Sequence, residues 1–169
     1  PIPNNIKDIG FNISLNENQS TITGYVLNDL YNESNLKNGL CGGILDAGTG
    51  TGKTIMGIYL ISKILLRSLV ICPNNVVLEA WKDDLTKSCS NNVNDNNLIK
   101  RVNFNDITKL KDINIILIQS AIKLTKSDLS NFGLVIYDEI HKYCTEKYHK
   151  IFELCQFKYI LGLSATPKH

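Results

Sequence analysis

A glycine-rich octapeptide, between a short apolar run and an apolar helical pattern, is the feature that most constrains this chain. Its sequence is Ala-Gly-Thr-Gly-Thr-Gly-Lys-Thr, from Ala47 to Thr54. Glycines remove the Cβ atoms that would keep successive backbone N–H groups from facing one anion, and the helix that follows adds its positive end. A loop of this kind between a strand and a helix predicts an α/β fold with a phosphate-binding site.

The side chains at the end of this loop indicate a nucleoside triphosphate. Lys53 supplies a point charge for the β- and γ-phosphates, and the Thr54 hydroxyl is a ligand for Mg²⁺ carried in with the nucleotide. The alternative is a glycine-rich turn that binds nothing. The expected nucleotide-binding residues of the loop are Ala47, Gly48, Thr49, Gly50, Thr51, Gly52, Lys53 and Thr54.

Short apolar runs alternate with helical patterns along the rest of the chain. Most of the runs are apolar at every position, as expected for parallel strands covered by helices on both faces. The alternation predicts a doubly wound, mainly parallel α/β sheet with helices on both faces. The expected strands are 40–45, 68–72, 113–118, 133–137 and 159–163, and the expected helices are 20–31, 54–66, 76–86 and 143–154.

Two of these helices have a defined apolar face. In the first, Ile22, Val26, Leu27 and Leu30 share one side, and in the third Val77, Trp81 and Leu85 recur every four residues. We expect residues 1–19 to form a polar lead-in and residues 20–169 one domain, with a solvated loop at 88–97 that is rich in Asn and Ser.

Composition excludes little by itself. A net charge of +2 and a pI near 8.4 are only mildly basic, so any nucleic-acid partner must be argued from motifs. The five cysteines form no C-x-x-C pair, and we expect reduced thiols without a metal, which favours an intracellular location without distinguishing nucleus, cytoplasm and virion. No apolar stretch reaches membrane-spanning length, and no signal peptide opens the sequence.

A pair of carboxylates follows the fourth apolar run. Asp138 and Glu139 begin the tetrapeptide Asp-Glu-Ile-His, which ends at His141. A parallel strand would deliver them to the edge of the sheet where the phosphate loop also opens. Asp138 would hold Mg²⁺, and Glu139 would orient and deprotonate the water that attacks the γ-phosphate. An acidic surface turn is the alternative.

The last apolar run leads into Ser164-Ala165-Thr166-Pro167. Together with Ala47 at the start of the loop and the Asp-Glu-Ile-His box, this segment resembles the superfamily 2 helicases of the DExH type. Within that superfamily, the sequence is similar to the XPB and UvsW group, including poxvirus-type helicases of large DNA viruses. The resemblance implies a RecA-like P-loop NTPase domain that uses ATP and Mg²⁺, and it implies that His141, Ser164 and Thr166 couple nucleotide state to the motor.

Three further segments match the family. The resemblance implies that Gln19 recognises the adenine edge, although a lone glutamine is usually a surface residue. It also implies that two segments grip a nucleic-acid strand, DNA more than RNA, where plain helix capping is the alternative. The residues concerned are Pro73, Asn74 and Asn75 in one segment and Gln119 and Ser120 in the other.

The resemblance further implies a partner domain. Enzymes of this family cleave ATP between two RecA-like domains, and the second supplies arginine fingers worth about 10³–10⁵ in rate. The sequence ends three residues after Thr166. We therefore expect the second domain to be absent from this chain, and expect this chain alone to hydrolyse ATP slowly. A duplex-DNA translocase without strand separation and a nucleotide-gated binding module are the alternative functions.

Overall fold

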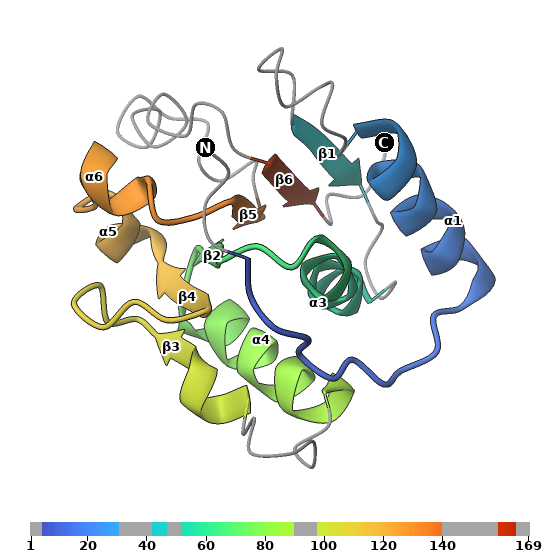
Figure 1. Cartoon of the computed structure of the whole chain (residues 1–169), viewed down its shortest axis with the longest axis horizontal. Helices are drawn as coiled ribbons and strands as arrows, with labels where there is room; N and C mark the ends of the chain where they lie inside the picture. Colours follow the sequence, from blue (N-terminus) through green and yellow to red (C-terminus); the bar gives the residue numbers. More distant parts are fainter. Residues whose placement is uncertain (1–4, 31–41, 47–51, 90–97, 140–158, 165–169) are drawn as a thin grey trace.

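The computed structural model describes residues 5–30, 42–46, 52–89, 98–139 and 159–164. Within them, six strands form one parallel sheet in the order β1-β6-β5-β2-β4-β3 (Figure 1). The α/β fold with a parallel sheet, predicted from the alternation of apolar runs and helical patterns, is confirmed.

The strands follow the predicted runs closely. Their bounds are β1 Gly42–Asp46, β2 Ser68–Cys72, β3 Val102–Phe104, β4 Ile113–Leu117, β5 Leu134–Asp138 and β6 Tyr159–Ser164. Strand β3 was not predicted, because it is three residues long and carries the polar Asn103 at its centre. It lies at the edge of the sheet and pairs with β4 alone.

The helices confirm the predicted pattern and shift its boundaries. Their bounds are α1 Glu17–Tyr25, the π-helical η1 Val26–Leu30, α3 Lys53–Ile64, α4 Asn75–Ser88, the 3-10 turn η2 Leu98–Arg101, α5 Ile118–Ala121 and α6 Lys126–Leu129. Helix α1 begins before the predicted Ser20, because Asn16 and Gln19 form a capping box at its N-terminus. The predicted helix at 143–154 lies outside the described residues.

Helices cover both faces of the sheet, and strand alternation decides which side chains meet them. On β5, Leu134 and Ile136 pack into the core beneath α3 and α4, whereas Val135 and Tyr137 pack into the second core beneath α5 and α6 (Figure 1). Because side chains alternate along a strand, Asp138 lies on the same face as Leu134 and Ile136. Its carboxylate is therefore directed toward α3 and α4.

The start of the described chain packs against this core. Ile6 and Ile9 are buried in it, and antiparallel bridges pair Asn5 with Leu66 and Phe11 with Cys89. The lead-in is thus no core strand, as expected, but its apolar side chains contribute to the core.

The predicted solvated loop at 88–97 is wrong at its first two residues. Ser88 ends α4 and Cys89 is its C-cap, and both are buried. The Ser88 hydroxyl donates to the Asp84 carbonyl, and the Ser88 carbonyl accepts from the backbone N–H of Asn12. The polar side chain is satisfied inside the protein, so composition misplaced the boundary. Residues 90–97 lie outside the described residues.

Candidate functional site

Three predicted site residues within the described part of the chain, Lys53, Asp138 and Ser164, lie at the carboxyl edge of the sheet. Asp138 ends β5, and Ser164 ends β6, which pairs with both β5 and β1. Lys53 opens α3 after the segment that follows β1. In an open parallel sheet this edge is where ligands bind.

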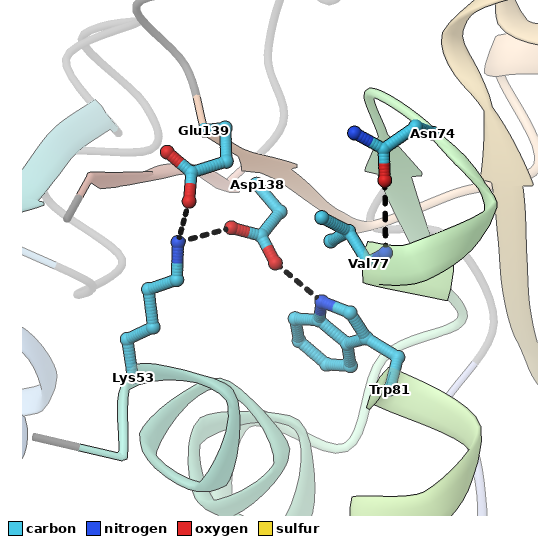
Figure 2. Close-up of polar contacts among 6 residues, drawn as sticks. All are labelled: Lys53, Asn74, Val77, Trp81, Asp138 and Glu139. Atoms are coloured by element: carbon cyan, nitrogen blue, oxygen red, sulfur yellow. Dashed lines mark hydrogen bonds and ion pairs between the residues drawn. The ribbon is translucent and has the colours of Figure 1, made fainter. Parts of the chain in front are cut away.

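Lys53 joins the two carboxylates. Its Nζ lies 2.9 Å from Asp138 Oδ1 and donates a hydrogen bond to Glu139 Oε1 (Figure 2). Burial by itself lowers the pKa of Lys53, but the hydrogen bonds and charges of Glu139 and Asp138 outweigh it, so this pKa is raised above its ordinary value. The ammonium is therefore a fixed positive charge at the carboxyl edge of the sheet.

Asp138 is held from a second side. Its side chain is 1% exposed, and its Oδ2 accepts a hydrogen bond of 2.7 Å from the indole N–H of Trp81, which lies fully buried on α4 (Figure 2). The helical periodicity predicted Trp81 as a core residue and missed this contact. One general rule could have indicated the contact from the sequence: a buried indole N–H needs a hydrogen-bond acceptor.

Glu139 leaves the strand with an unusual backbone. Its φ is +56°, in the left-handed region that a non-glycine residue rarely adopts. Such conformations cost about 1–3 kcal/mol and cluster at functional sites. This turn places the side chain beside Lys53, on the α3 side of the sheet edge.

Gln19 lies against the end of the phosphate loop. Gly52 has a φ of +72°, and a Cβ at this position would lie 2.6 Å from Gln19 Nε2. The side-chain Oε1 of Gln19 accepts a hydrogen bond from the backbone N–H of Asn16, which completes the helix cap. The predicted adenine-recognition residue is therefore next to the loop, and its role with nucleotide stays a prediction.

The predicted strand-gripping residues lie farther along the same edge. Asn74 and Asn75 are exposed where α4 begins after β2, and the Asn74 side chain accepts a hydrogen bond from the N–H of Val77, as a helix cap does. Gln119 is exposed after β4, and the Ser120 hydroxyl donates to Asn105 Oδ1. These contacts explain the local structure and leave the nucleic-acid role a prediction.

Several predicted residues fall outside the described part of the chain. Of Ser164 only the strand backbone is described. Thr54 is buried in the first turn of α3, directly after Lys53. The predicted residues outside the description are Ala47, Gly48, Thr49, Gly50, Thr51, His141 and Thr166.

The sequence of the chain matches, over residues 12–169, the family model described as type III restriction enzyme, res subunit. The chain belongs to this family. An African swine fever virus protein named as an ATP-dependent RNA helicase is 36% identical over 127 residues, covering 73% of this chain and 24% of the relative. A protein of invertebrate iridescent virus 6 named as a helicase is 30% identical over 126 residues, covering 73% of this chain and 28% of the relative. The chain thus spans about a quarter of the length of these relatives.

Solved structures share the fold of this family member. The UvsW helicase from bacteriophage T4 aligns with a TM-score of 0.69 at 17% identity, covering 96% of this chain and 56% of that chain. The Sulfolobus solfataricus SWI2/SNF2 ATPase core, solved in complex with double-stranded DNA, aligns with a TM-score of 0.67 at 23% identity, covering 97% and 34%. The resemblance to superfamily 2 helicases and the RecA-like fold are confirmed.

Among the helices of the described residues, none has the length and apolar character that crossing a membrane requires.

Proposed function

We propose that this chain is the ATP-binding motor domain of an ATP-dependent helicase that unwinds DNA. The observation that carries the proposal is the convergence of Lys53, Asp138 and Glu139 at the carboxyl edge of the sheet. Three groups of complementary charge, delivered by two separate elements, are what positioning and hydrolysis of a nucleoside triphosphate need. The relatives named as helicases support the ATP-dependent helicase activity; one of them is named as an RNA helicase, so the choice of DNA rests on other support.

The residues divide the chemistry between them. Lys53 binds the β- and γ-phosphates, which displace the carboxylates that neutralise its ammonium here. Glu139 accepts a proton from the attacking water, and the water oxygen forms a bond to the γ-phosphorus. The bond between the γ-phosphorus and the β,γ-bridging oxygen breaks at the same time, which leaves ADP and phosphate. Ser164, on the strand beside Asp138, together with His141 and Thr166, would pass the loss of phosphate to the rest of the motor.

Thr54 and Asp138 would hold Mg²⁺. Hydroxyl and carboxylate oxygens suit this cation, and each Asp138 oxygen has lone-pair capacity beyond its bond to Trp81 or Lys53. When bound, Mg²⁺ neutralises charge that develops on the phosphates. The pair fits a metal that arrives with its nucleotide and takes only one or two ligands from the protein.

Nucleic acid would bind along the other half of the same edge. The nucleotide residues follow β1, β5 and β6, whereas the two candidate strand-gripping segments follow β2 and β4, so one edge serves both ligands. DNA as the substrate is supported by the double-stranded DNA bound to the SWI2/SNF2 neighbour. The proposal includes a second RecA-like domain elsewhere in the protein, which completes the ATP cleft.

The test is ATP hydrolysis and strand displacement by the full-length protein on forked DNA and RNA duplexes of one sequence. We expect DNA-stimulated hydrolysis and displacement, both abolished by Lys53→Ala. Stimulation by RNA alone would contradict the DNA assignment. Hydrolysis with translocation but without displacement would favour a duplex translocase, and nucleotide binding without hydrolysis would favour a nucleotide-gated binding module.

A further inference from the structure

Trp81 is the single tryptophan of the sequence, and it contacts the candidate hydrolysis site from another helix. It is fully buried near the middle of α4, and its Nε1 donates a 2.7 Å hydrogen bond to Asp138 Oδ2 (Figure 2). A hydrogen bond to a carboxylate is stronger than one between neutral groups. With Oδ1 paired to Lys53, both oxygens of Asp138 are oriented by named partners.

The indole ring has little freedom to move within its helix pair. A Cβ atom at Gly57 would lie 2.7 Å from Trp81 Cη2, so the ring lies almost directly against the backbone of α3. Gly57 is one helical turn after Lys53. Because protein interiors are close-packed, Trp81 cannot change its position relative to Asp138 unless α3 or α4 shifts.

Helix α4 also carries the candidate nucleic-acid contact. Asn74 caps its N-terminus through a 3.0 Å hydrogen bond from the N–H of Val77, and Trp81 follows Val77 by four residues on the same face. A short α-helix moves as a unit, since its backbone hydrogen bonds are internal. A shift at Asn74 is therefore transmitted to the indole N–H.

We propose that Trp81 is a positioning residue that couples nucleic-acid binding at the start of α4 to the orientation of the Asp138 carboxylate. The inference rests on the proposed function and adds its route of regulation. When nucleic acid binds at the N-terminus of α4, the indole moves with the helix and turns the Asp138 carboxylate relative to the proposed phosphate and Mg²⁺ positions beside Lys53. Stimulation of hydrolysis by nucleic acid then depends on the indole N–H, not only on the bulk of the ring.

The first test compares Trp81→Phe with Leu85→Ala in the full-length protein. Phenylalanine keeps an aromatic ring and removes the donor. Leu85 is buried one turn later on the same face, and its side chain has no polar atom that could donate to Asp138. We expect Trp81→Phe to lower the DNA-stimulated kcat about tenfold or more, the scale of a hydrogen bond to a charged group. The KM for ATP should stay within about twofold, and more Mg²⁺ should be needed for half-maximal activity.

The control separates coupling from packing. Leu85→Ala should lower the unfolding temperature and leave the ratio of stimulated to basal kcat within about twofold of wild type. The inference is overturned if Trp81→Phe keeps the wild-type ratio, or if Leu85→Ala lowers it equally. A wild-type protein that DNA fails to stimulate would instead contradict the proposed function.

A second readout needs no turnover. The fluorescence emission of Trp81 is obtained by subtracting the spectrum of Trp81→Phe from that of wild type. This emission should shift when duplex DNA is added without nucleotide or Mg²⁺, because α4 moves. Asp138→Asn should change the emission of the protein without DNA, since the charged acceptor of the indole N–H is lost. This change is the difference between the spectra of wild type and Asp138→Asn, so it can be measured even if Trp81→Phe does not fold. Emission unchanged by DNA would overturn the inference.

Discussion

Lys53 Nζ lies 2.9 Å from Asp138 Oδ1, so the lysine of the phosphate loop and the carboxylate at the end of β5 form an ion pair across the sheet edge. Glu139 joins the same ammonium. Three charged groups therefore meet at the sheet edge where we propose that the nucleotide phosphates bind.

The ion pair predicts a stability change at high pH. The pKa of Lys53 is raised above its ordinary 10.5, because the partner carboxylates outweigh burial. Its stabilisation is thus complete below pH 10.5 and is lost as pH rises through the higher folded pKa. Urea unfolding of wild type and Lys53→Met should differ by a constant free energy at neutral pH, and by less above pH 10.5. If the difference in unfolding free energy between the two proteins shrinks between about pH 5 and 8, a group other than Lys53 is responsible for the stabilisation.

Glu139→Gln should separate nucleotide binding from hydrolysis. The amide keeps the size of the side chain but cannot accept a proton from water, so kcat of the full-length protein should fall by about 10²–10⁴. The Kd for ATP should change little. Glu79→Gln, an exposed change on α4, is the control and should retain wild-type kcat. Equal activity of the two variants would remove Glu139 from the proposed role.

Two glycine-to-alanine substitutions should change the free energy of unfolding in opposite directions. At Gly57 the new Cβ would meet the rigid Trp81 ring at 2.7 Å, so Gly57→Ala should destabilise the protein. The cost of such overpacking is about 1–3 kcal/mol. Gly24, in α1, has nothing within 4 Å of its Cβ position, and Gly24→Ala should stabilise the protein by about 0.4–1 kcal/mol. Chemical denaturation measures both, and a stable Gly57→Ala would show that the indole can move aside.

Asn74→Asp should distinguish a helix cap from a nucleic-acid contact. Asp caps helices about as well as Asn, so stability should remain within about 0.5 kcal/mol, whereas Asn74→Ala should cost about 0.5–2 kcal/mol. A negative charge at a strand-gripping site would repel phosphates and weaken DNA binding several-fold, most strongly at low salt. DNA affinity by fluorescence anisotropy checks this, and wild-type affinity of Asn74→Asp would leave Asn74 a cap only.

Most of the described secondary structure could be predicted from local sequence, and so could the meeting of Lys53 with Asp138 and Glu139 at the carboxyl edge of the sheet. Apolar runs gave the strands, because a strand buried on both faces must be apolar throughout. The same reasoning missed β3, whose Asn103 is buried beside Asn114 with its amide donating to the Asn114 side chain. A polar residue satisfied by a tertiary partner has no local signal. Ser88 was misplaced for another reason: its hydroxyl donates to the Asp84 carbonyl one helical turn earlier, and composition does not reveal that bond.

The sequence by itself determined that a glycine-rich segment stands between a strand and a helix, and that two carboxylates stand at the end of another strand, because local residue patterns specify both. Only the tertiary structure decided that Trp81 meets Asp138 and that Glu139 turns toward Lys53. The first depends on β2 lying beside β5, which brings α4 over the face that carries Asp138. The second depends on a left-handed backbone at Glu139, which the local sequence disfavours and the surrounding structure imposes.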